Sequence, residues 1–222
     1  MNPAAQWYFE SLELYKILCG ENAPAGFTLE TFEKNESLYA PGDPSDRIYF
    51  VKKGRVKIYY YSENKTEVVK AILSAGEIFG ELALSGEDKR SDYALALDNN
   101  TTVYRCSLEA MLGIMEKQSE ISLRMVKLIG LRMLKLERKV ELVALNDARH
   151  RVIEFLRDAA EWKGKKVGME TLIETPLTHR ELSKLVGISR QMLTRILNEL
   201  KRENLIYFDR RRILIRDLVH FH

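Results

Sequence analysis

The 222-residue sequence predicts an α+β protein with an N-terminal antiparallel β-roll (jelly-roll-like), a long central dimerisation helix and a C-terminal winged helix-turn-helix. Three observations lead to this prediction. Short β-rich runs separated by turn residues fill the first half of the chain. Apolar residues then recur at steps of three and four. A helix–turn–helix pattern with a basic face comes last. We expect an effector-sensing domain over 1–118, a dimerisation helix and hinge over 119–146, and a DNA-binding domain over 147–222.

The first half of the chain reads as one short helix followed by the strands of a roll. Apolar positions from Trp7 to Cys19 recur at helical spacing. From Phe27 onward, Pro-Gly, Lys-Gly, Glu-Asn-Lys and Ala-Gly sequences mark turns between runs of β-branched and aromatic residues. The predicted strands are 48–51, 56–61, 67–73, about 92–97 and 101–106.

A long helix is predicted after the roll. Ser107 begins a helical region that breaks near Gln118 and then continues to about Ala144. Its apolar residues recur at steps of three or four, the spacing of a seam for a partner helix. Burial in the same subunit is the alternative, and we favour a two-fold dimer. The predicted dimer-interface residues are Met125, Ile129, Met133, Leu136, Val140 and Val143.

The C-terminal part begins with a hinge at Asn146 and Asp147. Asp147 is expected to cap a helix over 148–162, which a polar loop over 163–170 follows. The stretch 177–202 then reads as two helices joined by a tight turn. Gly187 gives the turn its backbone freedom, and Ser189 caps the second helix.

The polar face of that second helix predicts DNA recognition. Guanidinium and amide groups near a helix N-terminus can pair bidentately with base edges in a major groove. A helical hairpin with a solvated polar face is the alternative. The segment 204–215 reads as two strands with a basic tip, a wing that contacts phosphates. The side chains assigned to DNA on these grounds are Arg190, Gln191, Thr194, Arg195, Arg210, Arg211 and Arg212.

Charge and composition narrow the function. The net charge is +3, but residues from 147 onward hold 16 basic and 11 acidic side chains, so the positive excess lies with the DNA-binding part. Two cysteines, Cys19 and Cys106, exclude a thiolate iron–sulfur or zinc site built by one subunit. No histidine precedes His150 to hold haem or a metal. We find no catalytic constellation, no signal-like start and no apolar run of membrane length, and therefore expect a cytoplasmic protein that is not an enzyme.

A roll, a long dimer helix and a winged helix-turn-helix in this order resemble the CRP/FNR family of bacterial transcription regulators over nearly the whole chain. In the roll the resemblance rests on Phe79-Gly80-Glu81-Leu82-Ala83-Leu84 followed by Arg90-Ser91. In the C-terminal domain it rests on Thr178, Glu181-Leu182, Val186-Gly187, Ser189-Arg190 and Arg195. The resemblance implies a homodimeric regulator that binds a near-palindromic double-stranded operator, with RNA polymerase as a further partner. A signalling module that acts through protein interactions is the alternative.

The resemblance also implies a cyclic-nucleotide effector in the roll. The implied site residues are Gly80, Glu81, Leu82, Arg90, Ser91 and Arg132. Two departures keep alternatives open. Leu136-Glu137 stands where cAMP-responsive relatives place Thr-Ser, and Asp92 adds an acid beside the phosphate site. The roll therefore binds a cyclic nucleotide or another small effector, or it retains the segment as scaffold.

The family's DNA-reading positions can be carried over as well. Arg190 and Arg195 match arginines that read guanine and phosphate, and the resemblance assigns phosphate contacts to Thr178 and Ser189. Gln191 stands where many members use a glutamate that accepts from cytosine. Because glutamine pairs best with adenine N6 and N7, we predict a changed base preference at that position.

Overall fold

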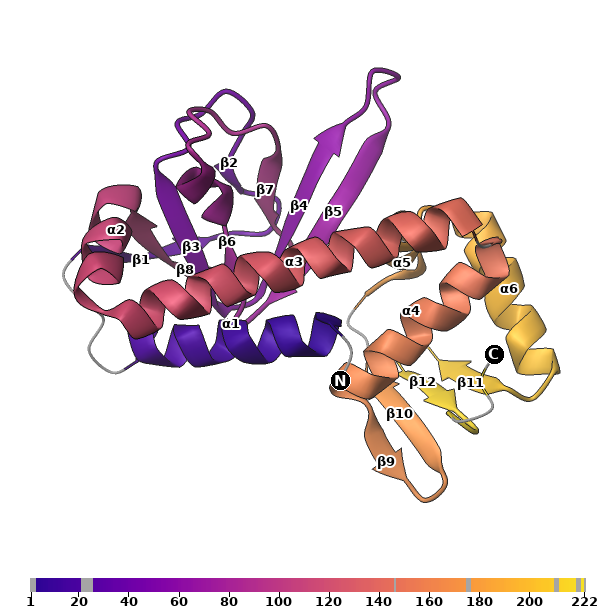
Figure 1. The fold of residues 1–222 in the computed structure, drawn as a ribbon. Helices are drawn as coiled ribbons and strands as arrows, with labels where there is room; N and C mark the ends of the chain where they lie inside the picture. Colours follow the sequence, from indigo (N-terminus) through magenta and orange to yellow (C-terminus); the bar gives the residue numbers. More distant parts are fainter. Residues whose placement is uncertain are drawn as a thin grey trace. The chain divides into compact units, whose positions relative to one another are not determined.

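The computed structural model describes residues 3–20, 26–145, 147–174, 177–209, 212–218 and 221 (Figure 1). It confirms the predicted α+β class, with a β-roll, a long helix and a C-terminal helix-turn-helix. The chain forms two compact units, residues 7–130 and residues 131–222 together with the first six. The division falls inside the long helix rather than at its ends. None of the described helices is both long and apolar enough to cross a lipid bilayer.

Among the described residues of the first unit, the strands form two four-stranded antiparallel sheets. Their strand orders are β1-β8-β3-β6 and β2-β7-β4-β5, and a 3-10 helix, η1 (Glu81–Ser85), follows β6. The two sheets bury their facing side chains, including Phe50 from one and Ile58 from the other. The strands are β1 (Phe27–Phe32), β2 (Ser37–Tyr39), β3 (Arg47–Lys53), β4 (Arg55–Tyr61), β5 (Glu67–Ser74), β6 (Ile78–Phe79), β7 (Tyr93–Ala96) and β8 (Thr101–Ser107).

All five strands predicted from the sequence are present, with bounds that differ by one or two residues. Strands β1, β2 and β6 were not singled out. Strands β2 and β6 are only three and two residues long, and β1 buries none of its residues fully. Short or unburied strands leave no period-two apolar pattern, which is the signal that the sequence offers.

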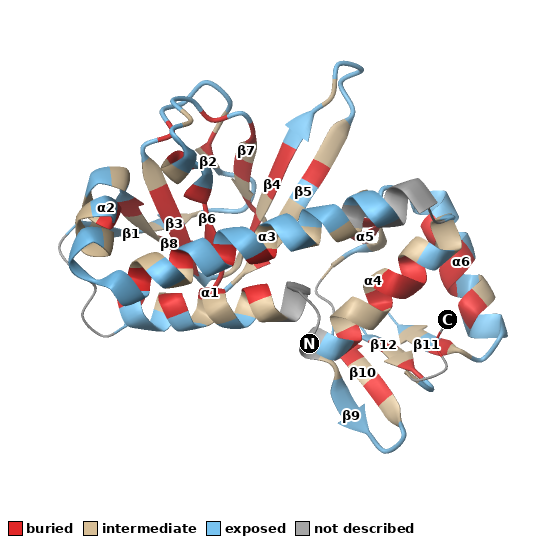
Figure 2. Cartoon of the chain, in the orientation of Figure 1, coloured by how far each residue is buried: buried red, intermediate tan, exposed pale blue. Residues whose placement is uncertain are grey.

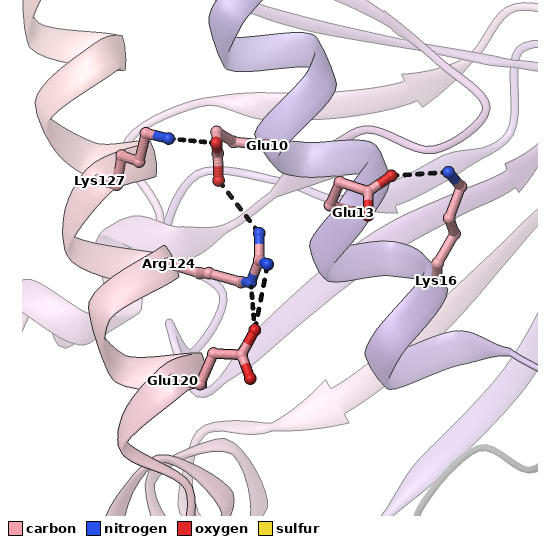
Figure 3. A network of polar contacts seen from close by, with 6 residues as sticks. All are labelled: Glu10, Glu13, Lys16, Glu120, Arg124 and Lys127. Atoms are coloured by element: carbon pink, nitrogen blue, oxygen red, sulfur yellow. Dashed lines mark hydrogen bonds and ion pairs between the residues drawn. The ribbon is translucent and has the colours of Figure 1, made fainter.

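Three helices flank the roll: α1 (Pro3–Cys19), α2 (Leu108–Lys117) and α3 (Ser119–Leu145). The hydroxyl of Ser107, where a helical region was predicted to begin, caps α2 by accepting the N–H of Ala110 at 3.1 Å. Within the first unit, α1 is joined to α3 by ion pairs (Figure 3). The carboxylate of Glu10 on α1 forms ion pairs with the ammonium of Lys127 and, at 3.3 Å, with the guanidinium of Arg124. These pairs fix the start of α3 against the N-terminal helix.

The second unit contains the helix-turn-helix and, among its described residues, a four-stranded sheet of order β11-β12-β10-β9. The Asp147 carboxylate caps α4 by accepting the N–H of His150 at 2.8 Å, as predicted. Helices α4 and α6 turn their buried residues toward a shared core (Figure 2). The elements are α4 (Ala148–Lys163), β9 (Lys165–Val167), β10 (Glu170–Glu174), α5 (His179–Val186), α6 (Arg190–Arg202), β11 (Ile206–Asp209) and β12 (Arg212–Ile215).

One prediction for this unit was wrong. The segment 163–170 was expected to be a loop, but it forms most of the β9–β10 hairpin. Gly168, at φ 63°, lies in the turn, and Thr171 and Ile173 of β10 are buried. Strand β9 is exposed at all three residues and begins with two lysines, so its sequence carries no strand signal.

Candidate nucleic-acid interface and effector site

Local hydrogen bonds define the helix-turn-helix. The hydroxyl of Thr178 accepts the N–H of Glu181 at 3.2 Å, and the Glu181 carboxylate accepts the N–H of Thr178 at 2.7 Å. This reciprocal capping box starts α5. Gly187 ends α5 at φ 75°, and the hydroxyl of Ser189 then caps α6 by accepting the N–H of Met192 at 3.1 Å. The predicted turn and cap are confirmed.

The inward face of α6 is entirely apolar. It packs against α5, where Ser183 is buried at the helix crossing and its hydroxyl donates to the carbonyl of Arg180. Ile188 in the turn is partly buried against the same core. This packing fixes how α6 presents its outward side chains. The buried residues of α6 are Leu193, Ile196, Leu197 and Leu200.

The outward face of α6 presents polar groups at its N-terminal turn. The side chains of Arg190 and Gln191 are exposed and make no hydrogen bond or ion pair to another described residue. Together with Ser189 and Thr194 they line a surface hollow of about 660 Å³. The side-chain donors of Arg190 and Gln191 are therefore available to an external ligand. The structure brings these four predicted residues together on one surface.

Two side chains predicted to contact DNA, Thr194 and Arg195, already have polar partners within α6. The hydroxyl of Thr194 donates to the carbonyl of Arg190 at 3.0 Å. The guanidinium of Arg195 lies 2.9 Å from the carboxylate of Glu199, one helical turn further on. Glu199 was not predicted from the sequence, although an acid four residues after an arginine is a recognisable helix pair. Met192, an exposed apolar side chain in the first turn of α6, was not predicted either.

The wing is held to the helices through aromatic contacts. The ammonium of Lys201 on α6 lies 4.7 Å from the ring centre of Tyr207, and the rings of His179 and Phe208 are 5.8 Å apart. Of the three predicted wing arginines, Arg212 is exposed at the start of β12. Arg210 and Arg211 lie outside the described residues, as does the hinge residue Asn146.

In the roll, two of the predicted effector residues, Gly80 and Arg90, lie in contact. Gly80 has φ 78°, and a Cβ there would lie 2.9 Å from the carbonyl oxygen of Arg47, so a larger residue would clash. The Arg90 guanidinium donates to the carbonyls of Gly80, at 3.2 Å, and Arg47. It lies 4.7 Å from the ring centre of Tyr39. Arg90 is buried, and its Nε has no hydrogen-bond partner among the described residues.

The other predicted effector residues differ in their exposure. Glu81 is buried in η1, whereas Leu82 and Ser91 are exposed. Arg132 lies on α3 in the second compact unit, so its part in the effector site stays a prediction.

Asp92 is buried close to Arg90 and has partners of its own. Its carboxylate lies 2.8 Å from the ammonium of Lys70 and accepts a hydrogen bond from Tyr39. Burial, together with the charge of Asp92, raises the pKa of Tyr39. Asp92 was singled out from the sequence, but Lys70 was not. A lysine inside the apolar strand Glu-Val-Val-Lys-Ala-Ile-Leu was the available signal.

The predicted dimer seam needs one correction. Met125 is only 1% exposed, buried within the first unit, whereas its neighbour Val126 is 66% exposed. The side chain of Val143 is not among those that the structure describes. The exposed apolar stripe, still spaced by three and four, is Val126, Ile129, Met133, Leu136 and Val140.

Comparisons with known proteins extend over both units. The family model of the cyclic nucleotide-binding domain matches residues 29–118, and that of the Crp-like helix-turn-helix domain matches residues 150–220. The chain is 27% identical over 188 residues to the global nitrogen regulator of Nostoc sp., covering 84% of each protein. It is 26% identical over 180 residues to the cyclic AMP receptor protein of Thermus thermophilus, covering 81% of this chain and 80% of the relative. A solved structure of a CooA mutant from Carboxydothermus hydrogenoformans has a TM-score of 0.81 at 27% identity, covering 94% of this chain and 93% of the other.

Proposed function

Because the chain belongs to the CRP/FNR family of transcription regulators, we propose that it binds near-palindromic double-stranded DNA as a homodimer controlled by a small effector. The observation that carries the DNA-binding part is the N-terminal turn of α6. The side chains of Arg190 and Gln191 there are exposed and make no hydrogen bond or ion pair to another described residue. The positive charge excess of residues 147–222 supplies attraction to phosphates.

Each side chain of this surface has a distinct role in the proposal. Arg190 reads guanine through O6 and N7, and Gln191 reads adenine through N6 and N7. Ser189 and the N-terminal N–H groups of α6 hold a phosphate, and Thr178 does the same at the start of α5. Arg195 contacts the backbone once it leaves Glu199. The wing arginines contact flanking phosphates; among them, Arg212 lies in the described part of the chain.

The exposed stripe of α3 supports the dimer. Its apolar residues at steps of three and four form a seam that a second α3 would bury in a two-fold pair. Two recognition helices related by this axis would read half-sites whose centres are about one helical turn, roughly 34 Å, apart. Such a regulator acts in the cytoplasm beside the chromosome, and RNA polymerase is a further partner in this proposal.

The roll is the proposed effector domain. The match to the cyclic nucleotide-binding domain, together with a relative named as a cyclic AMP receptor, makes a cyclic mononucleotide the first ligand to test. Glu81 would accept from a ribose hydroxyl, and Arg90 would supply positive charge for the phosphate. An effector shifts DNA binding only if it prefers the DNA-competent arrangement by a few kcal/mol.

The test is selection of binding sites from random DNA, followed by footprinting of the selected site at physiological salt. We expect a near-palindrome and at least about a thousandfold preference over random DNA. Arg190→Ala should weaken binding by about 1–3 kcal/mol and relax one base position. Lys165→Ala removes an exposed cation from β9 and is the matched control. A protein that binds selected and random DNA equally would overturn the proposal.

A further inference from the structure

Five residues of the roll form a connected group: Tyr39, Arg90 and Asp92, which are buried, and Tyr60 and Lys70, which are exposed. We refer to them as the pocket cluster. Lys70 contacts Asp92 at 2.8 Å and lies 5.5 Å from the ring centre of Tyr60. Tyr39 donates to Asp92, and Arg90 lies over the ring of Tyr39. The cluster thus runs from β5 to the arginine beside Gly80.

A β-bulge places Lys70 in this cluster. In the β4–β5 ladder Ile58 pairs with Ala71 and Tyr59 pairs with Val69, so Lys70 is the extra residue with no Cα partner on β4. A bulge changes the direction of the side chain at that point, and bulges are frequent beside functional sites. Here the bulge lets the ammonium of Lys70 reach Asp92 from two strands away.

Asp92 faces the interior of the roll because of its place before β7. Residues two and four positions further on, Ala94 and Ala96, are buried, and alternate residues of a strand share a face. The carboxylate is consequently close to both cations of the cluster, paired directly with Lys70 and linked through Tyr39 to Arg90.

The charges of this region balance. Lys70 and Arg90 are positive, whereas Asp92 and the nearby buried Glu81 are negative. A bound anion therefore gains no net attraction from these four groups, and a carboxylate near it would repel it. Removing one carboxylate leaves an excess positive charge, and removing Lys70 leaves an excess negative charge.

We infer that Asp92 is a built-in competitor of phosphate-bearing effectors: its carboxylate occupies the cationic side of the effector site and sets how tightly an anionic ligand binds. The inference rests on the effector site of the proposed function. It assigns Asp92 and Lys70 as specificity-determining residues with opposite effects. An effector binds by drawing Lys70 away from Asp92, so the pair must open as the ligand enters.

The test measures cAMP binding by calorimetry to the full chain, with uncharged adenosine as the comparison ligand. Asp92→Asn should bind cAMP at least about tenfold more tightly than the wild type, and Lys70→Met at least about tenfold more weakly. The double variant restores the charge balance and should lie near the wild type. Adenosine binding should change little in every variant, because adenosine carries no charge.

A matched control pair joins β4 and β5. Lys57 and Glu67 form an ion pair of 2.9 Å, similar to the 2.8 Å of Lys70 and Asp92, but Lys57 lies against Tyr59 on the opposite face of β4. Lys57→Met should leave cAMP affinity within about twofold of the wild type, since its charge is not beside the site. Melting temperatures show that each variant is folded, and Asp92→Ala replaces Asp92→Asn if the latter does not fold.

Two results would overturn the inference. One is a folded Asp92→Asn protein that binds cAMP no more tightly than the wild type, which includes the case that no variant binds cAMP. The other is a gain of affinity for adenosine as large as that for cAMP. Binding of each protein to the selected DNA site is measured in parallel. Intact specific DNA binding with either result refutes only the role of Asp92, whereas loss of specific DNA binding by the wild type refutes the proposed function.

Discussion

The guanidinium of Arg138, near the end of α3, lies 2.8 Å from the carboxylate of Glu154 on α4. Arg138 also lies 3.1 Å from Asp158, one turn further along α4. Glu154 is buried, and its carboxylate also lies 3.0 Å from the guanidinium of Arg157. These pairs join the two helices on either side of residue 146 within the second unit. The orientation of the DNA-binding core relative to the end of α3 is therefore held by charges as well as by chain connectivity.

Arg138→Ala should destabilise the second unit by about 1–3 kcal/mol, because it removes one partner of a buried carboxylate while Arg157 still compensates the other side. Denaturant unfolding followed by circular dichroism measures this. Arg149→Ala is the control, since its partner Glu203 is exposed and such surface pairs contribute less than about 1 kcal/mol. Equal losses in both variants would contradict a special role for Arg138.

Gln191→Glu should change the preferred base from adenine to cytosine at one position of each half-site. A glutamate accepts from cytosine N4, whereas glutamine pairs with adenine N6 and N7, and each such pair is worth about 1–3 kcal/mol. Selection of binding sites with both proteins reveals the exchange. Asn198→Asp makes the same change of charge further along α6 and should lower affinity without altering the preferred base.

Glu199→Gln should strengthen DNA binding about threefold to tenfold at low salt, because it releases Arg195 from its ion pair and removes a negative charge from α6. The dependence of affinity on salt should steepen by about one phosphate contact. Fluorescence anisotropy at several salt concentrations tests both expectations. Glu203→Gln removes the same charge one turn further along, at the C-cap of α6, and an identical gain there would argue against a direct role for Arg195.

Met133→Glu should raise the dissociation constant of the dimer at least about a hundredfold. Met133 lies in the exposed stripe of α3, and two-fold symmetry would place the charge in the seam twice. Sedimentation velocity measures the change. Leu112→Glu introduces the same charge at an exposed apolar residue of α2 and should leave the assembly intact. A dimer that tolerates Met133→Glu requires another interface.

The stability of the roll should fall as the pH rises above about 9. Burial raises the pKa of the Cys19 thiol from 9.0 to about 12, with the charge of Cys106 adding to the shift, and burial raises the pKa of Cys106 to about 11. A raised pKa favours the neutral thiol in the folded state. Its contribution is therefore complete below pH 9 and is lost as the pH rises toward 12, at up to about 1.4 kcal/mol per pH unit for each thiol.

Unfolding of the wild type at pH 8 and pH 10 tests this expectation. Cys19→Ala should reduce the pH dependence in this interval even if it lowers stability throughout. Tyr59, whose pKa burial raises to about 12, titrates in the same direction, so some dependence should remain. A Cys19→Ala protein with the full wild-type slope would contradict the assignment.

The sequence by itself determined the features that depend on neighbours along the chain. Ser189 and Asp147 cap their helices through N–H groups three residues away, and Gly187 ends α5 through its own backbone angles. The strands of the roll with alternating or continuous burial were also predictable, as was the polar face of α6. These signals are local because the hydrogen bonds and periodicities that create them extend over only a few residues.

Only the tertiary structure decided which distant residues meet. Met125 and Val126 both fit a period of three and four, but a step of one residue turns a helix by about 100°. Packing in the first unit buries Met125 and leaves Val126 exposed. The pairing of Lys70 with Asp92 depends on strand order and on a bulge that no local sequence pattern predicts. Register and bulges follow from the packing of whole sheets, so these contacts could not be predicted from the sequence.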